Sequence, residues 1–229
     1  MVIGVPAVRW VTFAKVLCPS LREAPLKQLQ VFTMKFSTLV MSTALFAGSA
    51  VAADFSAVPS GEYNVDPTHA YINFQYNHLG LSNPVLQFDE FNISMDLDTA
   101  DPSKSSVNVE IVTDSVDTGS EIWHEHITGE KWFDAANNPK ITFNSTEMIA
   151  NADGTFNVTG DLTVKDVTKP VMMVVTVNAA MLHPRSKKPI VGISAVGGLK
   201  RSEWNLGASA PFVSDEVKLE IQAEMVAAQ

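Results

Sequence analysis

Cysteine and positive charge are both scarce in this chain. Among 229 residues there is one cysteine, Cys18, which excludes an internal disulfide and a zinc site built from cysteine ligands. The 16 lysines and arginines are outnumbered by 25 aspartates and glutamates, which gives a formal charge of −9. Because phosphate binding needs clustered basic residues, we expect no nucleic-acid partner. The hydrophobic content of 46% is sufficient for a packed core.

Sequence motifs of nucleophilic catalysis and phosphate binding are also absent. There is no Gly-x-Ser-x-Gly elbow, no glycine-rich phosphate loop, and no cysteine after Cys18. His69 follows Asp66 by three residues, and Asp66 could orient its ring, but such pairs are common by chance. We therefore expect no catalytic residues, no cofactor and no enzymatic activity.

The pair His124 and His126 is the strongest candidate for metal binding in the sequence. Histidines at i and i+2 share a face on a strand but diverge by about 200° on a helix. The surrounding segment has helical character, and the i, i+4 spacing of metal-binding helices is missing. We predict a solvent-facing or capping role for both rings and no metal. The alternative is a metal-dependent hydrolase, which would need both rings and a third ligand to converge.

The sequence around Met34 has the order of a secretory signal peptide. Lys35 precedes an uncharged, apolar run over residues 36–48, and Ala50 and Ala52 fit the small-residue positions before a cleavage site. The run is shorter than the roughly 18–20 apolar residues that a membrane-spanning helix requires. We therefore expect a cleaved signal and no stable membrane anchor.

This pattern divides the chain into three segments. Residues 1–33 are expected to be a mis-assigned start or a disordered leader, residues 34–52 the signal peptide, and residues 53–229 the mature domain. A mature chain without cysteine suits an oxidising compartment. We predict a periplasmic protein.

Alternation of apolar and polar residues dominates the mature domain and predicts strands. Turn signals such as Asp153-Gly154 and Lys169-Pro170 separate the runs, which number about eight. The clearest runs cover residues 69–77, 91–98, 107–111, 141–146, 155–164, 171–177 and 217–225. One apolar face per strand indicates an antiparallel sheet that closes as a sandwich or a barrel. The strand lengths favour an all-β, eight-stranded antiparallel barrel, whose interior is filled by side chains or holds one slim ligand.

Residues 120–138 break this alternation and predict a short helical insert. Trp123 and Ile127 have helical spacing, Ser120 can cap the start of the helix, and Gly129 should end it. Such a helix can lie across one mouth of the barrel.

Aromatic residues and methionines are frequent on the apolar strand faces. A filled core and an elongated cavity for a lipid are both consistent with this pattern. If the interior is a cavity, the residues expected to contact the ligand are Ile72, Phe74, Tyr76, Phe91, Ile93, Met95, Ile127, Trp132, Phe143, Phe156, Val158, Leu162, Ile193 and Leu219.

A series of short motifs extends over residues 54–226. They include Tyr-Asn-Val-Asp at 63–66, Asn-His-Leu-Gly at 77–80, Asp-Ser-Val-Asp-Thr-Gly at 114–119, Trp-Phe-Asp at 132–134 and Val-Thr-Lys-Pro at 167–170. In their order and spacing they resemble the YceI-like, polyisoprenoid-binding family of exported bacterial proteins. The resemblance implies a lipocalin-like barrel with an insert helix that binds a long isoprenoid chain, of a quinone or a prenyl phosphate, in an apolar tunnel without a catalytic step.

The sequence departs from the family pattern at one end of the expected tunnel. Trp123-His124 replaces a usual Arg-Asp pair, Asp166 replaces a glycine, and tryptophan stands at Trp132 and Trp204 where phenylalanine is common. The first two changes affect the polar details of the tunnel mouth, and the two tryptophans suggest a repacked, narrower end. The main hypothesis is a periplasmic carrier or store of an isoprenoid lipid, and a homodimer could close a tunnel that is open at one end. The alternative is a packed barrel that acts as a stress-related interaction module.

Overall fold

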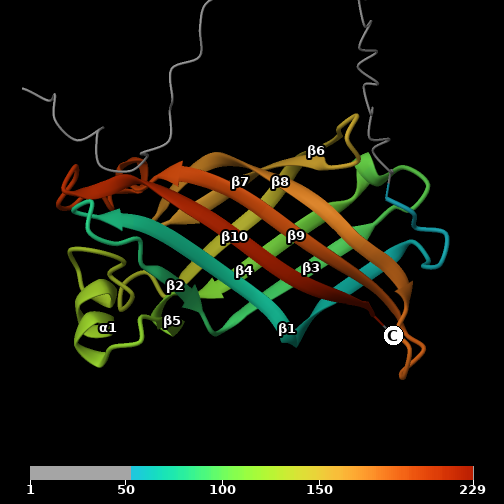
Figure 1. Cartoon of the computed structure of the whole chain (residues 1–229), viewed down its shortest axis with the longest axis horizontal. Coiled ribbons are helices and arrows are strands. Elements are labelled where there is room, and N and C mark those ends of the chain that lie inside the picture. The colour runs from blue at the N-terminus through green and yellow to red at the C-terminus, as the bar shows by residue number, and fades with distance from the viewer. Residues whose placement is uncertain (1–52, 229) are drawn as a thin grey trace, which may run out of the picture. The chain divides into compact units, whose positions relative to one another are not determined.

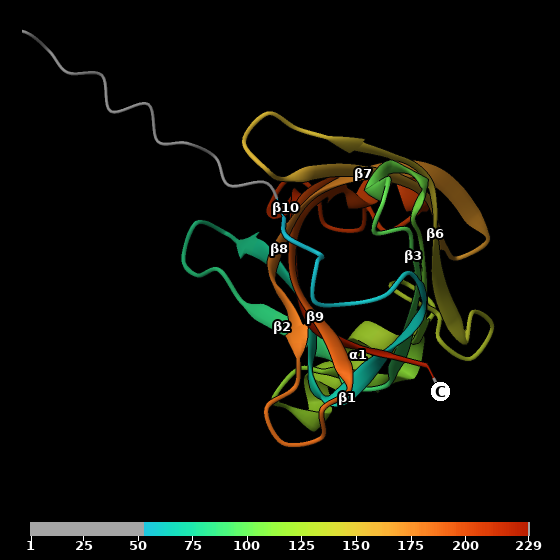
Figure 2. The same cartoon turned by 90° about the vertical axis from the view of Figure 1, so that its right-hand side faces the viewer.

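Within residues 53–228, the protein forms a closed barrel of eight antiparallel strands with one short α-helix (Figures 1 and 2). The computed structural model describes residues 53–228, so the expected leader and signal peptide lie outside the described residues. In order around the barrel, the strands are β1 (Gly61–His78), β3 (Phe91–Leu97), β4 (Ser106–Val112), β6 (Lys140–Ala150), β7 (Phe156–Val164), β8 (Val167–Leu182), β9 (Pro189–Lys200) and β10 (Val213–Ala227). The predicted eight-stranded antiparallel barrel is confirmed.

Pairing between the first and last strands closes the barrel. β10 pairs with β1 from Tyr63 opposite Ala227 to His78 opposite Val213. β3 pairs with the beginning of β1, and β2 (Val85–Phe88) pairs with its second half. β5 (Val116–Asp117) adds to β2. Together β2 and β5 extend the sheet toward the helix α1 (Glu121–Thr128), which lies at one end of the barrel (Figure 1).

The helix begins and ends where the sequence predicts. The Ser120 hydroxyl accepts a hydrogen bond from the Trp123 backbone N–H at 3.4 Å, and Gly129 follows the last helical residue. Ile127 is the buried residue of α1, and the partly buried Trp123 also packs against the core, so the helix contacts the barrel end through residues at i and i+4. Three 3-10 turns complete the elements: η1 (Pro102–Lys104), η2 (Thr113–Ser115) and η3 (Arg201–Trp204).

Strand β9 was missing from the clearest predicted runs, because glycines interrupt its alternation. Gly197 pairs with Met173 of β8, and a Cβ atom at Gly197 would collide with the sulfur of Met173. The glycine therefore makes room for a large neighbour on the same face. β1 and β8 are also longer than predicted, because register shifts at residues 65–70 of β1 and 177–179 of β8 break the strict alternation.

The end of the barrel opposite α1 is crossed by the segment that precedes β1. Figure 2 looks at this end, where residues 53–60 (blue) run across the opening. Phe55 and Val58 are buried in the core, and the Tyr63 hydroxyl donates to the Pro59 carbonyl oxygen at 2.7 Å. We call residues 53–60 the covering segment. The covering segment and α1 therefore lie over opposite ends of the barrel.

No helix within residues 53–228 is both long enough and apolar enough to cross a membrane.

Candidate functional site

The interior of the barrel holds an apolar cavity of about 710 Å³. Its walls come from all eight barrel strands, with Phe55 of the covering segment and Trp123 and Ile127 of α1 also in the lining. This volume lies within the range of roughly 300–1,000 Å³ that is usual for small-molecule sites. The sequence pattern left a filled core and a cavity as alternatives, and the structure has the cavity.

Thirteen of the fourteen candidate residues line this cavity. They are Ile72, Phe74, Tyr76, Ile93, Met95, Ile127, Trp132, Phe143, Phe156, Val158, Leu162, Ile193 and Leu219. Phe91 is placed differently: it is half-buried against the core and does not line the cavity. It is the first residue of β3, directly after the turn that leads from β2, where the strand joins the wall. The alternation rule assigned its face but not its distance from the cavity.

Several lining residues lay outside the predicted set. Phe88 belongs to the short strand β2, and its ring packs 5.4 Å from Phe74 and 5.9 Å from Phe133, between ring centroids. A four-residue strand gives too short an alternation to assign a face. Met173 lies in a run that is apolar on both faces, so the pattern there could not separate inside from outside.

Aromatic side chains gather at the α1 end of the cavity. Trp123 and His126 stack with their ring centroids 5.0 Å apart, and Trp132 Nε1 donates to His126 Nε2 at 3.0 Å. All three residues line the cavity. His126 is exposed, as the sequence predicts, and its ring in addition lines the cavity at this end.

The two helix histidines have separate partners. His124 Nε2 donates to the Asp114 carbonyl oxygen at 2.9 Å, which ties α1 to η2, whereas His126 Nε2 accepts from Trp132. Two rings held by different groups do not form the convergent pair that the metal-dependent hydrolase alternative requires. The hydrogen bond from His124 to a backbone carbonyl oxygen fixes the position of the helix, so His124 has a structural role.

Arg201 is the buried cation of the cavity wall. It is 6% exposed, lines the cavity, and stacks with its guanidinium carbon 5.3 Å from the Trp132 ring centroid. Its N–H groups donate to four backbone carbonyl oxygens, those of Leu206, Ala208, Val213 and Ser214. No carboxylate lies within ion-pairing distance of Arg201 among residues 53–228. Burial lowers the pKa of Arg201, and the nearby Asp215 carboxylate opposes this shift.

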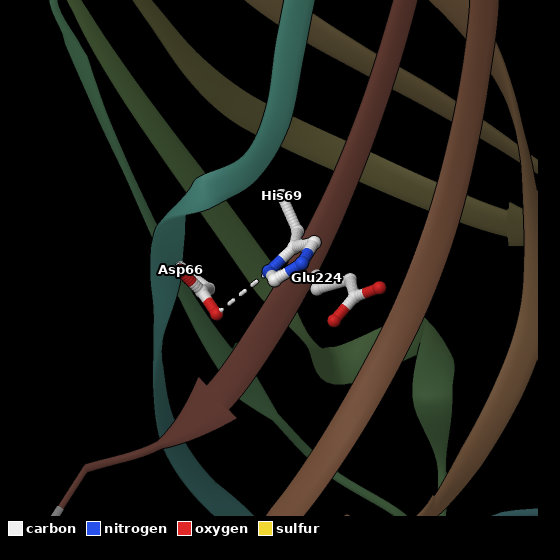
Figure 3. A group of neighbouring side chains, drawn as sticks. All are labelled: Asp66, His69 and Glu224. Carbon is white, nitrogen blue, oxygen red and sulfur yellow. Dashed lines mark hydrogen bonds and ion pairs between the residues drawn. The ribbon is translucent and has the colours of Figure 1, made fainter.

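A second cluster of titratable groups lies outside the cavity, where β1 bulges away from β10. Figure 3 shows Asp66 and His69 of the β1 bulge beside Glu224 of β10. His69 Nδ1 lies 3.1 Å from Asp66 Oδ2, so the predicted Asp–His contact exists. Hydrogen bonds from Thr68 lower the pKa of Asp66 to about 2, and Asp66 and Glu224 together raise the pKa of His69.

These three side chains could each offer one metal ligand atom, all within 4.8 Å of one another. His69 is exposed, however, and the second oxygen of Asp66 already accepts from the backbone and hydroxyl of Thr68. The observed hydrogen bonds stabilise the conformation of the β1 bulge at residues 65–70.

A closed antiparallel barrel with an apolar cavity and a helix at one end defines a lipocalin-like binding barrel. Residues 63–225 match the YceI-like domain, and the chain belongs to this family. The UPF0312 protein of Yersinia pestis (strain Pestoides F) is 36% identical over 184 residues, which cover 79% of this chain and 90% of that protein. The UPF0312 protein YE1254 of Yersinia enterocolitica is 34% identical over 187 residues, with 80% and 91% covered.

Solved structures share the fold. BcnA of Burkholderia cenocepacia is 26% identical, with a TM-score of 0.64, and the match covers 72% of this chain and 99% of BcnA. The YceI protein of Campylobacter jejuni is 25% identical, with a TM-score of 0.61, and the match covers 67% and 90%. A polyisoprenoid binding domain from Saccharophagus degradans, 14% identical with a TM-score of 0.56 over 74% of this chain and all of that domain, shows the likeness of fold alone.

Proposed function

We propose that this protein binds a long isoprenoid chain in its barrel cavity, for carriage or storage in the periplasm, and catalyses no reaction on it. The observation that carries the proposal is the apolar cavity of about 710 Å³, whose lining comes from every strand of the barrel. A slim hydrocarbon fits this kind of space better than a compact polar metabolite, because few polar groups face the cavity.

The energetics favour a long tail. Each buried methylene contributes up to about 0.8 kcal/mol, so affinity grows with the length of chain that the cavity encloses. Such binding needs no directional contacts with the tail. The choice of an isoprenoid over another hydrocarbon is supported by membership in the YceI-like family and by the Saccharophagus degradans neighbour described as a polyisoprenoid binding domain.

The periplasmic location is supported by the signal-like segment that ends near Ala52. The next residue, Ala53, packs against the core. Cleavage after Ala52 would therefore release the barrel with its covering segment intact. Residues 53–60 and α1 cover the two ends within one chain, so the proposal requires no second copy.

Binding without catalysis is supported by the state of the polar groups in the cavity wall. His126 accepts from Trp132, and Arg201 is held by backbone carbonyl oxygens, so neither presents a free base beside a nucleophile. The cluster of Asp66, His69 and Glu224 lies apart from the cavity lining.

The test is to produce the full chain with its own leader in a bacterial periplasm and to purify it without detergent. Mass spectrometry of the protein identifies its N-terminus, and mass spectrometry of an organic extract identifies bound lipid. A stoichiometric isoprenoid is the expected result. A folded protein that is empty and takes up no added prenyl quinone or prenyl phosphate would contradict the proposal and favour the interaction module.

A further inference from the structure

Most polar groups of the cavity wall are gathered at one end, with Asn73 of β1 and Ser105 as the exceptions. Tyr76, Trp123, His126 and Arg201 all line the cavity near α1, and Arg201 and Tyr76 are close enough to affect each other's pKa. His78, Thr118 and Ser209, the other polar residues of this region, lie at the end of β1, before α1 and before β10. The two ends of the cavity therefore differ in chemistry.

The opposite end is apolar. Phe55, Pro102 and Phe156 come together there, where the covering segment meets the turn between β6 and β7. Ser105 also lines this end, but its hydroxyl already accepts from the Asp98 backbone N–H at 2.9 Å. This end has a lining suited to the tip of a hydrocarbon tail, with the Ser105 hydroxyl as the single polar group named there.

Donors at the α1 end outnumber acceptors. The Trp123 indole N–H faces the Tyr76 hydroxyl oxygen, and this contact lowers the pKa of Tyr76 against the effect of burial. The proton of the Tyr76 hydroxyl has no acceptor among residues 53–228, and Arg201 uses four of its five N–H groups. The His126 nitrogen that could accept is already taken by Trp132. Arg201 is buried without a direct ion pair, so its charge, partly offset by the nearby Asp215 carboxylate, gives this end a positive potential.

We propose that the α1 end is a head-group site for a lipid whose head carries hydrogen-bond acceptor oxygens, neutral or anionic, and that the tail points toward Phe55. The Tyr76 hydroxyl, whose oxygen faces the Trp123 indole N–H, donates to the acceptor, and the charge of Arg201 favours it while disfavouring a cationic head. Ring carbonyls of a prenyl quinone and oxygens of a prenyl phosphate share this chemistry. The inference rests on the proposed function, since it assigns an orientation to the same ligand.

The test compares four probes of equal chain length on the mature protein after delipidation: a prenyl quinone, a prenyl phosphate, a prenyl ammonium and the prenyl hydrocarbon without a head group. We expect the quinone, the phosphate or both to bind at least about fivefold more tightly than the hydrocarbon, from one or two hydrogen bonds. The ammonium should bind more weakly than the hydrocarbon. The tighter binder of the two oxygen-bearing probes shows whether the site prefers a quinone ring or a phosphate as the head group.

The matched variants are Tyr76→Phe and Tyr71→Phe on the same strand. Tyr76 lines the cavity, whereas Tyr71 is 51% exposed on the outer face. Tyr76→Phe should reduce the preference for the oxygen-bearing head and leave hydrocarbon affinity within about twofold, and Tyr71→Phe should change neither. Because only a hydroxyl is removed, the fold is retained, and thermal unfolding of both variants verifies it.

The outcomes separate this inference from the proposed function. If the hydrocarbon binds as tightly as the oxygen-bearing probes and Tyr76→Phe changes nothing, the head-group site is refuted while lipid binding stands. Tighter binding of the ammonium would refute it as well. If no probe binds the folded protein, the proposed function itself fails. A quinone ring at the α1 end should also quench the fluorescence of Trp123 and Trp132, which line that end.

Discussion

Filling the cavity from its wall should displace the lipid without harming the fold. Ala195 of β9 is 5% exposed and lines the cavity, and its partners across the neighbouring strands, Val175 and Ile221, line it too. The substitution Ala195→Phe therefore places an aromatic ring in the middle of the cavity. The next residue, Val196, is 51% exposed on the outside of the same strand, so Val196→Phe is a matched control.

The size of the effect follows from the atoms displaced. The ring adds six carbons and excludes a similar number of ligand carbons. At about 0.3 kcal/mol per non-hydrogen atom of a drug-sized ligand, the loss is about 2 kcal/mol, or about 25-fold in Kd. At about 0.8 kcal/mol per buried methylene, the upper limit is about 5 kcal/mol. We expect Ala195→Phe to weaken prenyl quinone binding at least about 25-fold.

The assay is fluorescence titration of delipidated protein with a prenyl quinone, together with mass spectrometry of the lipid retained after purification. Thermal unfolding of the empty proteins should show Ala195→Phe no less stable than the parent, because the ring occupies existing empty space. Parental affinity and lipid content in a folded Ala195→Phe variant would refute the assignment of the cavity as the lipid site. A loss in Val196→Phe equal to that in Ala195→Phe would do the same.

Three further predictions concern the framework of the site. Gly197→Val should lower the free energy of unfolding by about 1–3 kcal/mol in urea titrations, because the new side chain collides with Met173. Ser120→Ala should destabilise α1 by about 0.5–1 kcal/mol through loss of the N-cap hydrogen bond, seen as faster hydrogen exchange confined to the helix. His69 should titrate above its ordinary pKa of 6.5 in NMR spectra, and Asp66→Asn should lower that pKa, because the carboxylate stabilises the protonated ring.

Each of these three predictions has a control or an outcome that would contradict it. Gly192 lies on the same strand as Gly197, and a Cβ atom there would meet only ordinary contacts, the nearest at 3.9 Å, so Gly192→Ala should change stability by less than about 1 kcal/mol. Equal costs at the two glycines would contradict the steric argument. Faster exchange in β6 as well as α1 after Ser120→Ala would mean that the cap supports more than the helix. A pKa of His69 that is unaffected by Asp66→Asn would mean that Glu224 dominates.

The sequence was sufficient to predict which strand faces point inward wherever apolar and polar residues alternate strictly. Alternation over four or more residues identified Ile72, Phe74, Ile93 and Met95, because a strand in a barrel wall has only two faces and one must be apolar. The helix α1 was predictable for a similar local reason: Ser120 and Gly129 are cap residues with a short reach. Local signals of this kind depend on neighbours in the chain, and they were reliable here.

The hollow interior and the buried cation were not predictable in this way. Whether Phe74, Phe143 and Met173 fill the barrel or line a cavity depends on its diameter, which strand number and tilt decide together. Arg201 follows Lys200 in a segment that looks solvated, and its burial depends on carbonyl oxygens from residues 206–214. The position of His126 in the cavity wall likewise depends on Trp132, which the alternation pattern does not address.

The apolar length of the cavity cannot by itself select among lipids. Burial of hydrocarbon contributes in proportion to area, so two tails of equal length bind about equally whatever head groups they carry. Polar contacts discriminate far more strongly, because a buried donor left without an acceptor costs the desolvation of that group. The donors of Tyr76, Trp123 and Arg201 lie together at the α1 end of the cavity. If the protein distinguishes one isoprenoid lipid from another, we expect these three side chains to do so, while the rest of the barrel determines how long a tail it holds.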